Sequence, residues 1–139
     1  MVSTAKPLSP AVTQLLRDAV AAAGAHDRTR AHALFRKATD LDAENESAWL
    51  WFANTADDPR DAVTGLRHAL RLNPGNPAAG PALPAALARA GVTAARAGDR
   101  AAAAEYLAEA TDLDPNNEAA WLWLAGVTDD PRRAATMLE

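Results

Sequence analysis

The sequence contains no cysteine, which excludes disulfides, thiolate metal sites and cysteine nucleophiles. Aromatic residues make up only 5% of the chain, and its apolar stretches are rich in alanine and poor in β-branched residues, which disfavours a sheet. No window approaches the roughly 18 consecutive apolar residues that a membrane span needs, and the first ten residues lack an apolar signal region. These absences predict an all-α protein outside the membrane, and we expect it in the cytoplasm.

The chain also lacks a concentrated basic stripe. Its formal net charge is −4, and the arginines are scattered, so a surface that contacts nucleic-acid phosphates is not expected. A neutral or basic protein or peptide partner is favoured by the net charge. The frequent use of alanine and arginine is typical of a bacterial gene with high GC content.

An internal duplication organises the chain, whose 139 residues and 49% apolar content predict a single domain over residues 1–139. Residues 38–42 recur as residues 110–114, and the sequence Trp-Leu-Trp at 49–51 recurs at 121–123, an offset of 72 residues in both cases. The repeat predicts a first unit at 10–72 and a second unit at 84–139. Between them, residues 73–83 are rich in proline and glycine, and we expect a non-helical connector there.

Each unit contains four segments with helical spacing of apolar residues, and those of the first unit are expected at about 10–25, 27–41, 46–56 and 59–72. Two starts are marked locally. Asp58 precedes Pro59, which combines a capping oxygen with a proline at the first helical position. Asn45 is likewise expected to cap a helix whose first residue is Glu46. The acidic pair at 57–58 is therefore interpreted as capping and not as a catalytic pair.

Three of these segments share one apolar rhythm, with small residues where a neighbouring helix approaches closely. Its members are Ala31, Leu34, Phe35, Ala38 and Leu41, then Ala62, Gly65, Leu66, Ala69 and Leu72, and then Ala103, Tyr106, Leu107, Ala110 and Leu113. With closing prolines at Pro74 and Pro115, and tryptophans at Trp49 and Trp121, the pattern resembles the tetratricopeptide repeat. The resemblance implies stacked antiparallel helix pairs in a right-handed α-solenoid, with a concave groove for a protein or peptide partner.

Catalytic and metal-binding constellations are missing from the sequence. His26, His32 and His68 have no serine, cysteine or ligand-spaced partner, so we interpret them as solvent-facing. We expect no enzymatic activity, no metal and no cofactor.

The tryptophans suggest where a partner binds. Trp49 and Trp51 lie two residues apart, so on a helix they point about 200° away from each other and only one can enter the core. If Trp49 and Trp121 take the buried consensus place, then Trp51 and Trp123 either face the groove or pack between repeats. The candidate partner-binding residues are Trp51, Trp123, Arg17, Arg89, Asn54, Leu50 and Leu122.

Some proteins of the resembled family hold terminal carboxylates with asparagine and basic residues of the first helices. Here only Arg17, Arg89 and Asn54 are of those types, in a different combination. An apolar, partly aromatic groove flanked by arginine is therefore the expectation.

Two other functions stay open, namely a self-associating assembly module and an accessory segment of a larger enzyme or sensor protein. The last helix is expected to begin at Pro131 and stop at Glu139, which leaves Met137 and Leu138 without a covering neighbour. We therefore expect either a homodimer through the C-terminal repeat or a natural chain that continues further.

Overall fold

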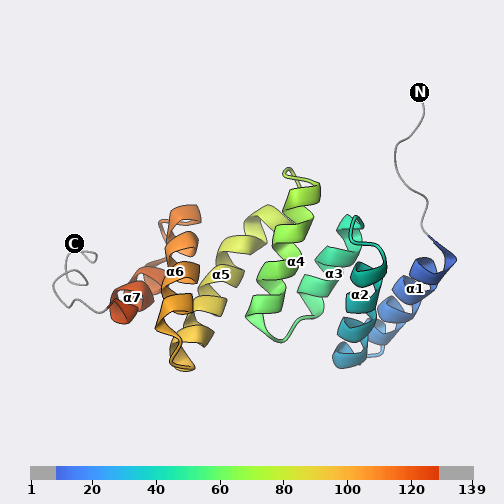
Figure 1. Ribbon diagram of the computed structural model, residues 1–139, viewed down its shortest axis with the longest axis horizontal. Helices are drawn as coiled ribbons and strands as arrows, with labels where there is room; N and C mark the ends of the chain where they lie inside the picture. Colours follow the sequence, from blue (N-terminus) through green and yellow to red (C-terminus); the bar gives the residue numbers. More distant parts are fainter. Residues whose placement is uncertain (1–8, 129–139) are drawn as a thin grey trace.

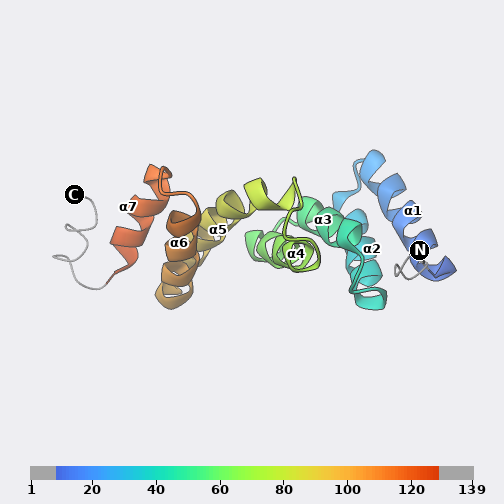
Figure 2. The same cartoon turned by 90° about the horizontal axis from the view of Figure 1, so that it is seen from above.

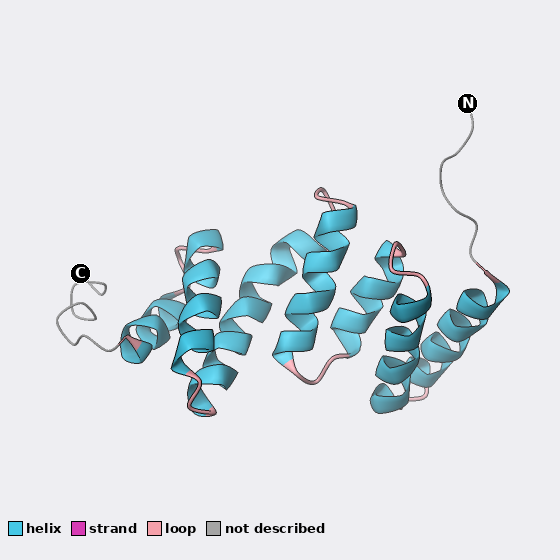
Figure 3. Ribbon diagram, viewed as in Figure 1, coloured by secondary structure: helices cyan, strands magenta, loops and turns pink. Residues whose placement is uncertain are grey.

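The computed structural model describes residues 9–128, and 79% of them are helical with no strand among them (Figures 1 and 3). The expected all-α class is confirmed. The helices of this part are α1 (Pro10–Gly24), α2 (Arg28–Leu41), α3 (Glu46–Thr55), α4 (Pro59–Leu72), α5 (Ala79–Arg96), α6 (Arg100–Leu113) and α7 (Glu118–Val127). The predicted last helix, with Pro131, Met137 and Leu138, lies outside the described residues.

The helices form an elongated stack in which consecutive helices run antiparallel (Figure 1). Each helix packs against its neighbours in sequence, and α5 also contacts α7. Seen from above, the odd-numbered helices form one row and the even-numbered helices the other, with α1 and α7 at opposite ends (Figure 2). Since each pair contacts only nearby pairs, the molecule is a solenoid.

Side-chain caps explain where the helices begin. Asn45 Oδ1 accepts the N–H of Ala48 at 3.0 Å, and Asp58 Oδ1 accepts the N–H of Arg60 at 2.9 Å. These bonds satisfy N–H groups that have no partner inside the helix. Both predicted starts are confirmed, and the four helices expected in the first unit agree with the structure to within one residue at each end.

The predicted connector at 73–83 is wrong at its C-terminal end, because α5 already begins at Ala79. Pro81 lies in the first turn of this helix, where the missing N–H removes no helical bond. Pro84 lies inside the helix and removes one bond. Helical structure therefore resumes at residue 79, and the non-helical connector is limited to 73–78.

Buried Asn76 accounts for the early start of α5. Its Oδ1 accepts the N–H groups of Ala78 and Ala79 at 2.9 and 2.8 Å, which caps the first turn from outside the helix. Its Nδ2 donates to Glu46 Oε1, and Asn73 Nδ2 donates to the same oxygen at 2.9 Å. The connector is thus held against the start of α3.

The turn between α1 and α2 contains a residue in the left-handed region, His26 at φ 61°. The equivalent residue of the second unit is Gly98, at φ 84°. Glycine adopts this conformation without a Cβ penalty, whereas another L-residue costs roughly 1–2 kcal/mol there. The same turn is therefore kept in both units although only the second has glycine.

Gly65 marks the closest approach between α3 and α4. A Cβ at this position would lie 2.8 Å from the carbonyl oxygen of Trp49 and 2.9 Å from Cβ of Ala53. Because one of these atoms belongs to backbone, the helices would have to move apart to accept a side chain. Glycine at this place of the apolar rhythm therefore sets the distance between the two helices.

We expect Gly65→Ala to lower the free energy of unfolding by about 1–3 kcal/mol through overpacking, despite the higher helix propensity of alanine. Gly24→Ala is the matched control, since a Cβ at Gly24 meets nothing within 4 Å. The control is expected to be neutral or slightly stabilising. Urea denaturation followed by circular dichroism measures both, and equal midpoints for the two variants would contradict the close approach.

Candidate functional site

The seven candidate partner-binding residues differ in exposure. Arg17, Trp51, Asn54, Arg89 and Leu122 are exposed, Trp123 is half-buried, and Leu50 is half-buried against the core. All of them lie on odd-numbered helices, so they share one row of the solenoid. Leu50 is the member that packs inward.

A hollow of about 450 Å³ lies between the C-terminal end of α3, the start of α4 and the middle of α5. Asn54 and Arg89 line it, together with Arg28, Asp57 and Pro59 among others. The Arg28 guanidinium donates to three carbonyl oxygens at the end of α3, those of residues 54, 55 and 56, at 3.0–3.2 Å. Arg28 also pairs with Asp57 at 3.1 Å. The charges of this pair therefore offset each other.

A second hollow, of about 410 Å³, lies between α5 and α7, and we call it the α5–α7 hollow. Its wall includes Arg89, Val92, Thr93, Arg96 and Trp123. The Arg96 guanidinium carbon lies 5.7 Å from the centroid of the Trp123 ring, in the range of a cation–π contact. This contact places a positive charge beside the aromatic ring at the hollow.

The hollows are neighbours along the solenoid, because they share lining residues. The first two share Pro59 and Arg89, and a third hollow of about 310 Å³ is lined by Leu122 and shares Trp123 with the second. We call the three together the α3–α7 groove. Four of the predicted residues therefore line these hollows, namely Asn54, Arg89, Leu122 and Trp123.

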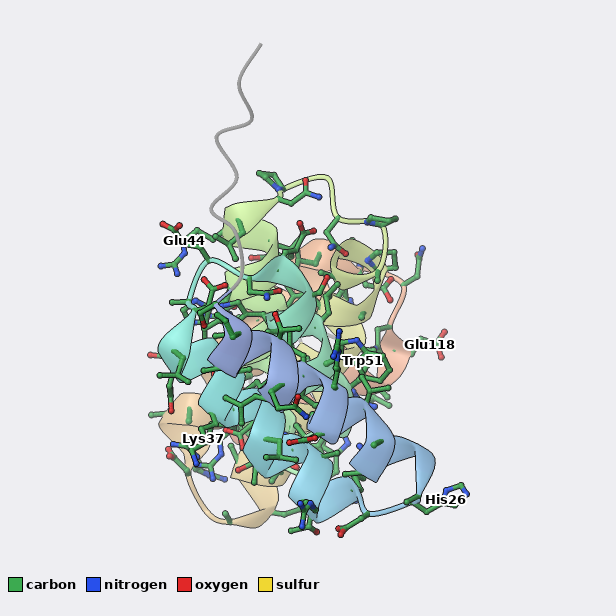
Figure 4. The ribbon with its side chains drawn as sticks, turned by 90° about the vertical axis from the view of Figure 1, so that its right-hand side faces the viewer. His26, Lys37, Glu44, Trp51 and Glu118 are labelled. Carbon is green, nitrogen blue, oxygen red and sulfur yellow. The ribbon has the colours of Figure 1, made fainter. Side chains whose placement is uncertain are left out.

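The other three predicted residues, Arg17, Leu50 and Trp51, line none of these hollows. Trp51 is 40% exposed, and its ring stacks on Phe35 with a centroid distance of 5.3 Å. Figure 4 shows Trp51 on the side opposite Lys37. In the second unit Leu107 replaces Phe35, so Trp123 lacks this stacking partner.

Trp49 takes the buried position, as predicted, with 9% exposure. Its Nε1 donates to the carbonyl oxygen of Ala43 at 2.9 Å, and Trp121 Nε1 makes the equivalent bond to Pro115 at 2.9 Å. The indole N–H groups of both copies are therefore paired with backbone, although Trp121, unlike Trp49, is only half-buried. The predicted opposition of Trp49 and Trp51 is confirmed by their burial.

Sequence reasoning missed several residues of the groove, above all Arg28 and Arg96. A signal for Arg96 was present, since it follows Arg89 by seven residues and so lies on the same helix face two turns later. Arg28 gave no such signal, because its contacts are to residues about 27 positions away.

The prediction that all three histidines face solvent is contradicted at two positions. His26 is exposed, but His68 is half-buried and stacks on Trp49 at 3.9 Å between ring centroids. His32 is also half-buried, stacks on Phe52 at 4.5 Å, and places Nδ1 3.1 Å from Thr55 Oγ1. The solvent-facing interpretation is wrong for these two, because apolar ring faces find aromatic partners in the core.

Burial, with the nearby positive charge of Arg71, lowers the pKa of His68 below its ordinary value of 6.5. As the pH falls, the unfolded chain therefore binds a proton at His68 near pH 6.5, whereas the folded protein binds it only at a lower pH. We expect the free energy of unfolding to fall as the pH drops through 6.5 toward the lowered pKa. His68→Phe, which keeps a ring on Trp49 but does not titrate, is expected to lose this part of the dependence. Urea denaturation between pH 8 and 5 measures it, and parallel curves would refute the assignment.

The described residues contain no group of three or more histidine or acidic side chains placed to hold a metal ion. Within residues 9–128, none of the helices combines the length and apolar character needed to cross a membrane.

Comparison with known proteins shows the fold. Neither a protein-family model nor a curated protein sequence matches this chain. Among solved structures, a crystal structure of MamA, a tetratricopeptide-repeat protein, matches 94% of this chain and 70% of its own, with 18% identity and a TM-score of 0.58. The first tetratricopeptide-repeat domain of Spaghetti (RPAP3), bound to the HSP90 peptide SRMEEVD, matches 92% of this chain and 96% of its own, with 18% identity and a TM-score of 0.50. The chain is therefore built on the tetratricopeptide-repeat fold.

Proposed function

We propose that this chain is a non-catalytic protein-interaction scaffold that holds a peptide or helix of a partner protein in the α3–α7 groove. The observation that carries the proposal is the series of neighbouring hollows, in which Arg89 lines the first and the second and Trp123 lines the second and the third. The peptide-bound Spaghetti domain supports it as an example of the same fold in that use.

The groove has the chemistry of a recognition surface. Trp123 offers a large rigid ring, of the kind that anchors partners at interfaces. The side chains of Asn54 and Arg89 make no hydrogen bond or ion pair with any described residue, so their donors are available to a ligand. A few such polar groups on an apolar wall fix the orientation of a bound segment.

A histidine, a hydroxyl and a carboxylate lie close together elsewhere in the protein, as in a hydrolase site, but their geometry does not suit catalysis. His32 lies between Thr55 Oγ1 at 3.1 Å and Asp61 Oδ2 at 3.7 Å. The hydroxyl of Thr55 donates to the carbonyl oxygen of Trp51 at 2.8 Å, and Thr55 is only 7% exposed. A nucleophile needs access to substrate and a proton it can pass to the base. This arrangement therefore stabilises the contact between α2 and α3 and supports no catalytic proposal.

Phage display tests the function: the whole chain is immobilised, and binders are selected from random 12-residue peptides fused to the N-terminus of a phage coat protein. Isothermal titration calorimetry then measures the affinity of the selected peptides for the chain and its variants. We expect Trp123→Ala and Asn54→Ala to weaken binding by about 10-fold or more, as for interface anchors.

Leu113→Ala is the matched control, because Leu113 is 52% exposed and lines none of the three hollows. The control is expected to bind like the original chain. If no peptide is enriched over an empty surface, or if all three variants bind alike, the scaffold function in this groove is refuted.

A further inference from the structure

The α5–α7 hollow has a local charge opposite to that of the whole protein. The net charge of the chain is −4, yet the hollow is lined by Arg89 and Arg96 and by no acidic residue. The nearby Glu118 is not part of the lining, and its side chain points outward in Figure 4. At physiological salt, charges interact over about 8 Å, so a ligand in the hollow senses these arginines more than the distant carboxylates.

The two arginines are available to an anion. Arg89 is exposed and has no hydrogen-bond or ion-pair partner among the described residues. The guanidinium carbon of Arg96 lies over the Trp123 ring, and its N–H groups make no hydrogen bond or ion pair with another described residue, so they can donate to an anion. A carboxylate placed there would meet planar donors and the edge of an apolar ring at once.

The equivalent place in the first unit is built differently. Arg17 and Trp51 correspond to Arg89 and Trp123, but Gly24 stands where the second unit has Arg96. The Trp51 ring is also stacked on Phe35, and neither Trp51 nor Arg17 lines any of the three hollows. The duplication has therefore produced one site with two arginines and one copy with a single arginine.

We propose that the α5–α7 hollow binds an acidic segment of the partner, with a side-chain carboxylate on Arg89 and an adjacent apolar or aromatic side chain against Trp123. The proposal rests on the proposed function and names the chemistry of the segment that the groove takes. It replaces the neutral or basic partner that the net charge alone favours, because recognition is decided by the charges lining the site.

The composition of the selected peptides is the first test. Binders from the phage library are expected to be enriched in aspartate and glutamate next to an apolar residue. They are then synthesised with amidated C-termini, so that only side-chain carboxylates remain. Neutral or basic consensus sequences would overturn this inference while leaving the scaffold function intact, whereas a library without binders would remove both.

Charge reversal at equivalent positions of the two units is the second test. Arg89→Glu is expected to weaken the amidated peptides by about 30-fold or more, while Arg17→Glu, with the same change in net charge, is expected to weaken them less than about 3-fold. Arg89→Lys is expected to fall between the original chain and Arg89→Glu, because lysine keeps the charge but loses the planar pair of donors. Circular dichroism checks that all variants are folded. Equal losses in Arg89→Glu and Arg17→Glu would overturn the inference, since only the overall charge would then matter.

Discussion

Replacing Trp49 with alanine is expected to lower the free energy of unfolding by about 3–5 kcal/mol. The side chain is 9% exposed, packs edge-on to Phe52, stacks on His68 and donates to the carbonyl oxygen of Ala43. The substitution removes the ring from between α3 and α4 and leaves a cavity there, and it also leaves that carbonyl without its donor. Urea denaturation followed by far-ultraviolet circular dichroism measures the loss.

Trp51→Ala is the contrast built into the same helix. Trp51 is 40% exposed, so part of its side chain already meets water while its ring stacks on Phe35. We expect its loss to cost about 1–2 kcal/mol, mainly from the stacked pair and partial burial. If Trp49→Ala and Trp51→Ala lower the denaturation midpoint equally, the division of the two tryptophans between core and surface is refuted.

Phe35→Ala is the second substitution with a large expected effect, again about 3–5 kcal/mol. Phe35 has no exposed surface and is among the largest fully buried side chains of the described residues. Its removal opens a cavity in the core beside α2 and also takes away the ring on which Trp51 stacks. Thermal and urea denaturation are both suited to measuring it.

The duplication supplies the control for this position, because the second unit carries Leu107 there, also without exposed surface. Phe35→Leu copies that solution and is expected to cost less than about 2 kcal/mol, since most of the buried volume is kept. It should also raise the exposure of Trp51, which acrylamide quenching of fluorescence detects in a background where the other three tryptophans, Trp49, Trp121 and Trp123, are replaced by phenylalanine. Equal destabilisation by Phe35→Leu and Phe35→Ala would show that the aromatic stack, not buried volume, decides the stability here.

The sequence by itself determined the fold class, the positions of most helices and the fold resemblance. These depend on local physical chemistry, such as the cap that Asn45 provides and the proline at the first position of α4. The apolar rhythm also placed Gly65 at a helix contact, because the spacing of small residues reports which face a neighbour approaches. Helical geometry likewise separated Trp49 from Trp51, since positions two residues apart on a helix point in nearly opposite directions.

Only the tertiary structure decided the start of α5, the state of the histidines and the shape of the groove. Proline and glycine in residues 79–84 argue locally against a helix, yet Asn76 caps this one from the connector and is itself held by Glu46 of α3. His68 is covered only once α4 lies on α3 and brings it to Trp49. The α5–α7 hollow joins residues from helices separated by a third one, and periodicity within one helix carries no information about side chains on another.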